Sequence, residues 1–492
     1  MPVTLSLKSL LDLPDTVGRP AYDRAALKPG IVHFGVGNFH RSHQAVYLDD
    51  LFNTGEGHDW ALIGAGVFEG EKPGRARLEA QDWLTTVVEQ DAGHREARVT
   101  GVMIDFLTPG DTQAIIDQLA DPRIRIVSMT ITEGGYFIDA ASGRFNPTHP
   151  DIVADARNMA APKTVFGLIL AGLMRRRDEE GVPFTVMSCD NIPHNGHVAA
   201  DAVVGLARLV DEDLASWVSE HVAFPNGMVD RITPATSERE RQILEREFGV
   251  SDNWPVFCEP FRQWVLEDRF NDGRPALEKV GVQFVADVAP FELMKIRILN
   301  GGHAVIAYPA GLMDIHFVHE AMEEPLVRGF LQKIEEDEII PTVPPVPGVV
   351  LQDYYRQVAG RFSNPTIGDT VRRLCLDGSN RQPKFIIPTI ADRLKAGKGI
   401  DGLALESALW CRYCFGTTDS GAVIEANDPN WERMQAMAGA ARTDPGAWLA
   451  MADIYGDVGT SRVFADAFAR HLAALWANGT RATLQAYLSG TA

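Results

Sequence analysis

The segment Gly30–Gln44, with the sequence GIVHFGVGNFHRSHQ, is the most informative part of the chain for its fold class. It begins as an apolar, β-branched run, passes through a turn that contains Gly35 and Gly37, and continues as a helical pattern. This order matches the GxGxxG fingerprint of a dinucleotide-binding unit, with His40 in the third glycine position. The glycines let the backbone approach a pyrophosphate, which the free N–H groups of the following helix attract. Any tight turn could contain two glycines, so it is the position between a strand and a helix that favours a cofactor site.

The chain alternates between strand-like and helical patterns up to about residue 285. Strand-like runs begin at Trp60, Arg123 and Pro183, and helical patterns begin at Thr112 and Thr164. Such alternation predicts an α/β fold with a parallel sheet. From residue 286 onward helical patterns dominate, and the proline-rich stretch 341–347 predicts a rigid loop. We therefore expect a Rossmann-like nucleotide-binding domain over residues 1–285 and a mainly α-helical substrate domain over residues 286–492.

Two acidic residues follow the second strand-like run, which ends at Val67: Glu69 and Glu71. A carboxylate at this position accepts hydrogen bonds from an adenosine ribose and repels a 2′-phosphate, so NAD is favoured over NADP. The distance from the glycines exceeds the usual spacing of about 20 residues, which leaves open which acid is used. Either acid alone is equally well explained as a solvated surface residue.

The stretch Pro290–Tyr308, PFELMKIRILNGGHAVIAY, carries polar side chains on an otherwise apolar helical pattern. At about 100° per residue its four polar candidates lie within an arc of roughly 140°: Glu292, Lys295, Asn300 and His303. An exposed helical stripe explains this pattern as well as a site does. Oxidation of an alcohol by hydride transfer needs a base and donors to the developing alkoxide, and a lysine and amide groups supply these. Asn191 ends another strand-like run, where ligands of parallel sheets collect.

Two competing chemistries for alcohol oxidation lack their sequence signatures. None of the 9 tyrosines is followed by a lysine four positions later, so the chain lacks a Tyr-xxx-Lys proton relay. The histidine pairs do not form an HExxH or a cysteine–histidine cluster with zinc spacing, and the isolated pair Cys411 and Cys414 is better explained by packing. The sequence therefore predicts no metal site.

Length and composition limit the partners of the protein. A chain of 492 residues favours two domains, and the net charge of −20 argues against DNA or RNA as a partner. The 5 cysteines do not suggest a disulfide framework, and the start of the chain does not resemble a signal peptide. The longest apolar run, Val165–Met174, is about half a membrane span. We expect a cytoplasmic protein without a membrane partner, present as a monomer or weak dimer.

Six motifs together resemble the mannitol dehydrogenase family, the polyol-specific long-chain dehydrogenases, over essentially the whole chain. They are GVGNFHRSHQ from Gly35, TITEGGYFID from Thr130, SCDNIPHNG from Ser188, PNGMVDRITP from Pro225, CEPFRQWVLED from Cys258 and KIRILNGGH from Lys295. The resemblance implies a Rossmann-like domain, a mostly helical C-terminal domain, an active site between them, and metal-independent hydride transfer between a polyol and NAD. His40 agrees with the family pattern.

The resemblance also implies roles for individual residues. Lys295 resembles the general base, Asn191 and Asn300 the oxyanion donors, and His303 a substrate-positioning residue, while Glu292 would help the released proton reach solvent. Implied substrate contacts are Asp230, Arg373 and Lys384, and implied cofactor contacts are Gly35, Gly37, Asn38, Phe39, His40, Arg41, Glu69 and Glu133. From the residues alone, Asp230 and Arg231 are equally well explained as a buried ion pair.

The resemblance favours oxidation of D-mannitol at C2 to D-fructose. Alternatives within the family are D-arabinitol or sorbitol dehydrogenases and hexuronate reductases, whose substrate carboxylate would need an extra cationic contact. A catalytically silent NAD-binding sensor is the alternative from another class, and the complete set of proton-transfer residues argues against it.

Overall fold

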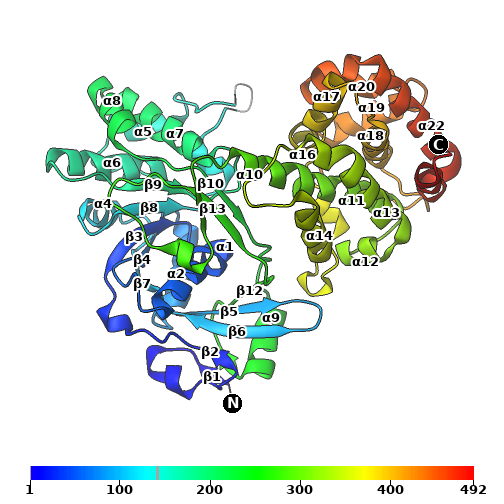
Figure 1. The fold of residues 1–492 in the computed structure, drawn as a ribbon. Helices are drawn as coiled ribbons and strands as arrows, with labels where there is room; N and C mark the ends of the chain where they lie inside the picture. Colours follow the sequence, from blue (N-terminus) through cyan, green and yellow to red (C-terminus); the bar gives the residue numbers. More distant parts are fainter. Residues whose placement is uncertain (1, 140–142, 492) are drawn as a thin grey trace. The chain divides into compact units, whose positions relative to one another are not determined.

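The protein is described by a computed structural model that covers residues 2–139 and 143–491 (Figure 1). The chain divides into two compact units, Met1–Val288 and Ala289–Ala492. No helix among the described residues is long and apolar enough to cross a membrane.

The centre of the first unit is a five-stranded, fully parallel sheet with the order β7-β4-β3-β8-β9 (Figure 1). Its strands are β3 (Pro29–Phe34), β4 (Ala61–Ala65), β7 (Met103–Phe106), β8 (Ile126–Met129) and β9 (Thr185–Ser188). The first of these strands in the sequence lies in the middle, and the strand order reverses between β3 and β8. In doubly wound sheets this reversal marks the place where ligands bind at the carboxyl ends of the strands. The predicted Rossmann-like fold is confirmed.

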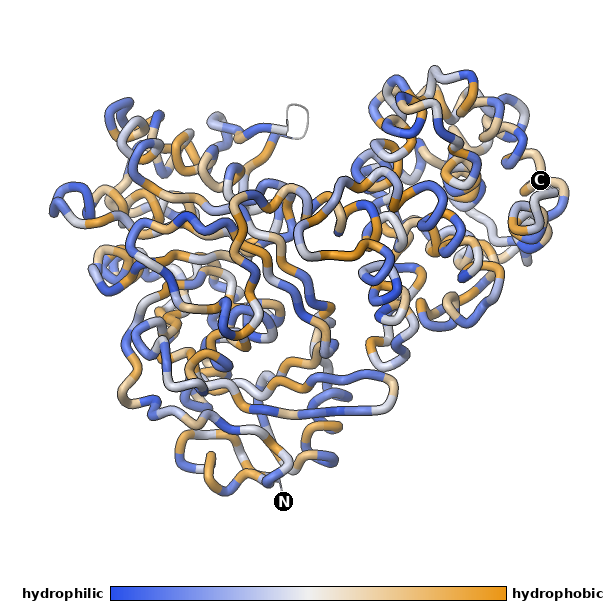
Figure 2. Tube along the Cα trace, viewed as in Figure 1, coloured by the Kyte–Doolittle hydropathy of each residue, from blue (hydrophilic) through white to orange (hydrophobic). Residues whose placement is uncertain are grey.

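Both faces of this sheet are covered, which explains why its strands are almost continuously apolar. Val32 and Phe34 of β3 pack in one core with residues of α4 (Thr112–Ala120), α6 (Val165–Asp178) and α7 (Asn195–Val210). Ile31 points to the other face, where it packs with residues of α2 (Gln44–Asn53). Figure 2 shows the hydrophobic colours concentrated along these interior strands and helices.

Smaller sheets flank the central one. A four-stranded sheet contains β2 (Val17–Gly18), β5 (Thr85–Gln90), β6 (Arg95–Thr100) and β12 (Val256–Cys258). A three-stranded sheet contains β10 (Gly227–Asp230), β13 (Gln263–Glu267) and β14 (Gln283–Val285), and β1 (Val3–Thr4) pairs with β11 (Val250–Ser251). The remaining α-helices of this unit are α1 (Asn38–Ser42), α3 (Lys72–Glu79), α5 (Pro150–Arg157), α8 (Glu212–His221) and α9 (Glu238–Ile243).

The second unit is helical, as predicted, and its described residues contain no strand beyond isolated bridges. The helix α18 (Asp401–Cys414) is buried along nearly its whole length, and it packs against α22 (Arg462–Ser489). The others are α10 (Ala289–Met294), α11 (Gly301–Leu312), α12 (Val318–Glu323), α13 (Pro325–Ile334), α14 (Leu351–Phe362), α15 (Val371–Leu374), α16 (Gly378–Phe385), α17 (Ile387–Lys395), α19 (Trp431–Ala441), α20 (Gly446–Leu449) and α21 (Ala452–Tyr455). After the single turn Ile340–Thr342, residues 343–350 contain no helix or strand.

Two departures from regular helical geometry lie next to the predicted site residues. The helix after Gly37 is interrupted at His43, which separates α1 from α2. The His43 ring is buried, stacks on Phe39 with ring centroids 4.7 Å apart, and bonds through Nε2 to the carbonyl of Gln263 at 2.9 Å. The stretch Lys295–Asn300 is a π-helical turn, η7, between α10 and α11. Neither irregularity was predicted from the apolar spacing of the sequence.

Candidate active site

The glycine turn at the carboxyl end of β3 requires glycine at Gly35. Its φ is +88°, and a Cβ there would lie 2.1 Å from the carbonyl oxygen of Thr130. That carbonyl belongs to the segment after β8, so Gly35 permits the contact between neighbouring strand ends. At Gly37 the nearest atom to an added Cβ would be 3.8 Å away, which leaves open space in front of α1. The turn therefore fits a pyrophosphate, because backbone N–H groups can approach one here without a side chain between them.

His40, in the third glycine position, packs the helix against the strand in its own way. Its ring stacks on His33 of β3, with the two centroids 3.5 Å apart. His40 Nδ1 bonds Gln44 Oε1 at 3.1 Å, and His33 Nδ1 bonds Ser128 Oγ at 2.8 Å. Burial lowers the pKa of His33 to about 3 and that of His40 well below its usual value, so both rings are neutral. Two imidazoles thus provide the close helix–strand packing that a third glycine usually allows.

Arg41 anchors the start of α1 from within. Its guanidinium lies 3.9 Å from the ring centroid of Trp254, donates to the carbonyl of Trp254, and donates to Asn38 Oδ1 at 2.8 Å. Burial lowers the pKa of Arg41 to about 9. Its hydrogen bonds hold the turn, and its Nε donates to the Gly37 carbonyl at 3.3 Å.

The two acids after β4 differ in what they contact. Glu71 Oε2 accepts the backbone N–H of Val67 at 2.9 Å and of Phe68 at 2.8 Å, so its carboxylate caps its own turn. Burial raises the pKa of Glu71. The Glu69 side chain is 80% exposed and pairs with Lys72 at 2.7 Å. Of the two acids, Glu69 is thus the exposed one, whereas the Glu71 carboxylate is engaged by its own backbone.

Asp190, which the sequence analysis did not single out, organises the ends of β8 and β9. Its carboxylate accepts the N–H groups of Ile131 and Thr132, each at 2.9 Å, and the hydroxyl of Tyr136 at 2.8 Å. Burial raises the pKa of Asp190. These bonds hold the turn that presents Glu133, and Asn191 follows Asp190 directly. Asp190 could have been identified from the sequence, because it is an acid directly beside the predicted site residue Asn191 in the SCDN motif.

Asp230 is the last residue of β10 and is buried. The strand is held to α7 by Asn195, whose side chain donates to the Gly227 carbonyl at 2.7 Å and accepts the Gly227 N–H at 2.9 Å. The next residue, Arg231, forms an ion pair with Glu89 at 2.6 Å. Arg231 is thus engaged by a carboxylate on another strand.

In the second unit, the π-helical turn changes the arrangement of the predicted polar set. A π-helix bonds residues five apart, so Lys295 and Asn300 lie one turn apart rather than at the α-helical offset. Glu292 precedes the turn on α10 and His303 follows it on α11. Lys295 and Glu292 are buried. π-turns of this kind occur frequently at functional sites.

His303 is held by an aromatic partner and surrounded by cations. Its ring stacks on Phe362 of α14, with centroids 4.2 Å apart. Burial, with smaller contributions from Arg373, Arg361 and Arg381, lowers its pKa well below the usual value. A neutral imidazole can donate one hydrogen bond and accept another, which suits a hydroxyl group.

The two cationic residues predicted at the substrate site, Arg373 and Lys384, differ in their contacts. Both nitrogens Nε and Nη2 of Arg373 donate to the Asp369 carboxylate, which raises the pKa of Arg373. Lys384 is exposed on α16, next to Phe385, whose carbonyl lies 3.7 Å from a Cβ added at Gly301. Lys384 therefore neighbours the helix that carries Asn300.

A buried acid, Glu335, lies against the same helix and was missed by the sequence analysis. Gly302 is the residue before His303, and a Cβ added there would lie 3.1 Å from Glu335 Oε1. Glycine at this position therefore leaves room for the Glu335 carboxyl group. Burial raises the pKa of Glu335 well above its usual value. It begins another π-helical turn, Glu335–Ile339.

The cysteines and metal-binding residue types form no centre in the described part of the chain. Cys411 and Cys414 are buried in α18, and burial raises the pKa of both thiols well above the usual value. No three His, Cys, Asp or Glu side chains of residues 2–139 and 143–491 are grouped so as to hold a metal ion.

The chain is similar to known proteins over both of its units. Residues 29–279 match the family Mannitol dehydrogenase Rossmann domain, and residues 287–476 match the family Mannitol dehydrogenase C-terminal domain. A mannitol 2-dehydrogenase of Cereibacter sphaeroides is 61% identical over 476 residues, 96% of this chain and 99% of the relative. A mannitol 2-dehydrogenase of Phaeosphaeria nodorum is 40% identical, and the match covers 99% of this chain and 86% of the relative.

Two solved structures are similar over nearly the whole chain. The Pseudomonas fluorescens mannitol 2-dehydrogenase in ternary complex with NAD and D-mannitol has a TM-score of 0.87 and 44% identity, covering 99% of this chain and 100% of the other. A D-sorbitol dehydrogenase in substrate-free form has a TM-score of 0.91 and 36% identity, covering 98% and 100%. The chain belongs to the mannitol dehydrogenase family.

Proposed function

We propose that this protein is an NAD-dependent polyol dehydrogenase that oxidises D-mannitol at C2 to D-fructose without a metal ion. The observation that carries the proposal is the similarity to mannitol 2-dehydrogenases over both units, at 61% identity in one relative. The relative solved with NAD and D-mannitol supports both the cofactor and the substrate class.

The residues of the first unit fit NAD. The open space at Gly37 suits a pyrophosphate, and the exposed Glu69 carboxylate suits an unphosphorylated ribose, which disfavours NADP. Gly35, Asn38, Phe39, His40 and Arg41 shape this turn, and Glu133 lies at the end of the neighbouring strand. When bound, NAD+ accepts the hydride that leaves the alcohol carbon.

The chain's own residues would manage the proton and the oxygen. Lys295 takes the hydroxyl proton as general base, and Asn191 and Asn300 donate hydrogen bonds to the oxygen as its charge develops. Neutral His303, held by Phe362, orients a neighbouring hydroxyl. Glu292, three residues before Lys295, passes the proton onward, and Asp230, Arg373 and Lys384 contact the polyol.

A second polyol is the nearest alternative, because a D-sorbitol dehydrogenase has the TM-score of 0.91. A hexuronate is a further alternative, and two arginines of the second unit offer little to its carboxylate. The Arg373 guanidinium that could bind a substrate carboxylate is already engaged by the Asp369 carboxylate, and Arg381 Nη1 donates to the Leu374 carbonyl at 3.1 Å.

The test is NADH formation by purified, EDTA-treated protein with mannitol, arabinitol and sorbitol, repeated with NADP. We expect the largest kcat/KM with mannitol and NAD, undiminished by the chelator. A preference for another polyol would change the substrate and keep the mechanism, whereas loss of activity with EDTA that zinc restores would refute metal independence. Turnover with hexuronates alone would assign the other branch of the family. No turnover with any of them would leave a silent NAD-binding protein.

A further inference from the structure

The segment 231–234, which follows β10, is fastened to the helix behind the glycine turn. Thr233 Oγ1 and Ser42 Oγ share a hydrogen bond of 2.8 Å, and Asn38 Nδ2 donates to the Pro234 carbonyl at 3.1 Å. Arg231 Nη1 donates to the Ser42 carbonyl at the end of α1. Because Asn38 and Ser42 belong to α1, the segment after Asp230 and the predicted pyrophosphate-binding helix are held as one piece.

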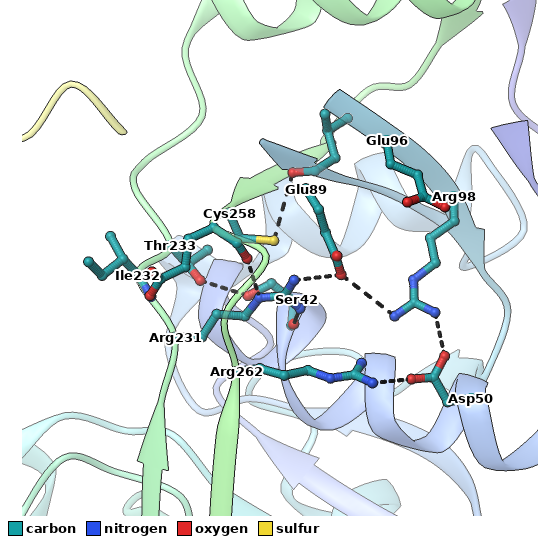
Figure 3. A network of polar contacts seen from close by, with 12 residues as sticks. Ser42, Asp50, Glu89, Glu96, Arg98, Arg231, Ile232, Thr233, Cys258 and Arg262 are labelled. Carbon is teal, nitrogen blue, oxygen red and sulfur yellow. Dashed lines mark hydrogen bonds and ion pairs between the residues drawn. The ribbon is translucent and has the colours of Figure 1, made fainter. Parts of the chain in front are cut away.

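Arg231 is the centre of this connection. Its side chain has no exposed surface, and its three nitrogens reach three different parts of the first unit (Figure 3). Nη1 reaches α1, Nη2 pairs with Glu89 of β5 at 2.6 Å, and Nε donates to the Glu259 carbonyl after β12 at 3.0 Å. The Glu259 carboxylate returns to the same segment, where Oε1 accepts the Ile232 N–H at 2.6 Å.

A chain of alternating charges holds Glu89 in place. Glu89 also lies 3.8 Å from Arg98 of β6, Arg98 pairs with Asp50 of α2, and Asp50 pairs with Arg262 before β13 (Figure 3). The Glu89, Arg98, Asp50 and Arg262 side chains are about one quarter exposed, whereas Arg231 is fully enclosed. The network is thus anchored at its buried end on Arg231.

A planar guanidinium presents its nitrogens in a fixed fork, so two hydrogen bonds and one ion pair in three directions fix its position and that of its backbone. Asp230 is joined to Arg231 by a peptide bond. Movement of α1 on cofactor binding would therefore be transmitted to Asp230, and movement of Asp230 to α1. Lysine at this position would keep the charge, but its single nitrogen could not reach the three partners that three guanidinium nitrogens contact.

We propose that Arg231 is a positioning residue that couples the dinucleotide site at α1 to the polyol contact at Asp230. The proposal rests on the proposed function, since it takes α1 as the cofactor helix and Asp230 as a substrate contact. It predicts that cofactor and polyol strengthen each other's binding through this residue, an effect that is reciprocal by linkage.

The experiment compares the full-length wild type, Arg231→Lys and Arg98→Lys, which is the matched control. Arg98 belongs to the same network and undergoes the same change, but it contacts neither α1 nor the segment 231–234 in the bonds described. For each protein we would measure the melting temperature, the NADH Kd by fluorescence with and without mannitol, and kcat and KM for mannitol.

For Arg231→Lys we expect the KM for mannitol to rise about tenfold, kcat to change less than about threefold, and mannitol to lose its effect on the NADH Kd. Arg98→Lys should keep all three near wild type. A purely structural role would lower the melting temperature of Arg231→Lys and leave KM and the mannitol effect unchanged, which would overturn the proposal. An equal effect of Arg98→Lys would also overturn it.

If Arg231→Lys does not fold, Glu89→Gln replaces it, because it removes the ion pair at a partly exposed position and leaves Arg231 in place. A KM increase of several-fold with kcat retained would then support the proposal, and wild-type constants would refute it. A wild type that turns over no polyol would refute the proposed function itself, and the coupling with it; failure in the variants alone would refute only the coupling.

Discussion

Lys295 is the residue on which the proposed chemistry depends. In Lys295→Ala we expect turnover to fall on the order of 10³-fold, the usual contribution of a positioned general base, with NADH binding nearly unchanged. In the wild type, polyol oxidation should rise with pH as one group loses its proton, and ketose reduction should prefer lower pH. Steady-state rates and NADH fluorescence titration across pH would measure both.

The matched control for this substitution is Lys395→Ala, at an exposed position of α17. It should retain wild-type rates and pH profiles. Wild-type turnover in Lys295→Ala would end the assignment of the general base.

Glu69 and Glu71 offer a second comparison between single residues. Glu69→Gln should raise the KM for NAD about tenfold and reduce the preference for NAD over NADP, because a charge-assisted hydrogen bond and a repulsive charge are both lost. Glu71→Gln should keep that preference and lower the melting temperature, because its carboxylate caps the backbone of Val67 and Phe68. The reverse pattern in kcat/KM with the two cofactors would assign the ribose to Glu71.

At the level of secondary-structure elements, the two glycines of the turn should affect different properties, Gly35 the stability of the fold and Gly37 the binding of the cofactor. Gly37→Ala should leave the melting temperature unchanged, since its Cβ enters open space, and should raise the NADH Kd at least about tenfold because that space is the proposed phosphate position. Gly35→Ala should destabilise the fold instead, because its Cβ would lie 2.1 Å from the Thr130 carbonyl oxygen. Thermal melts and NADH titrations of both variants test this, and tight NADH binding by Gly37→Ala would move the phosphate site elsewhere.

The buried helix α18 carries an acid that makes stability depend on pH. Burial raises the pKa of Glu406 from its usual 4.5 to about 8. Between these values the folded protein keeps a proton that the unfolded chain releases, so this group's contribution is present at low pH and is lost as pH rises toward 8. Glu406→Gln removes this dependence and keeps an acceptor for Gln382 Nε2, which lies 2.5 Å from Glu406 Oε1.

Relative to wild type, Glu406→Gln should therefore gain stability as pH increases from 5 to 7.5, by up to about 3 kcal/mol. Chemical unfolding at both pH values measures this gain. The control Glu432→Gln, at an exposed position of α19, should show no such trend. A constant difference between Glu406→Gln and wild type would show that the acid titrates normally.

Sequence reasoning predicted those elements whose signal is periodic. The strand at Gly30, the glycine turn and the helical second unit follow from apolar spacing and glycine placement, and the structure confirms that fold class. The break at His43 could not be predicted, because the His43 ring bonds to the carbonyl of Gln263, a residue distant in sequence. The π-turn at Lys295 was not predicted either, because the polar residues there fit a regular helical pattern equally well.

The same limit applies to the site. Motifs identified Lys295, Asn300 and Asn191, and these roles stay predictions. The supporting residues Asp190, Glu335 and Glu89 were not identified because their importance comes from burial and from partners brought close by folding. From the sequence alone, an acidic residue can equally well be an exposed surface residue or a buried structural one, and only the fold distinguishes these two cases.

At the scale of the whole molecule, the net charge of −20 should keep copies of the chain apart. We propose that the protein is a monomer or a weak dimer. Sedimentation velocity should show a species near the chain mass of 53.9 kDa at low protein concentration and moderate salt. A concentration-independent larger species would contradict this, and raising the salt would show whether charge repulsion sets the balance.

The π-turn has a consequence for the design of a protein that carries the proposed catalytic residues Lys295, Asn300 and His303. A π-turn can be regarded as an α-helix that has gained one residue, so removing one residue between Lys295 and Asn300 would return the segment to regular α-helical register. The amide would then come one position closer to the lysine in sequence, while the rest of α11, with His303, would rotate relative to Lys295. A designed scaffold built on an ideal straight helix would therefore present Lys295, Asn300 and His303 at angles around the helix axis that differ from those in this protein.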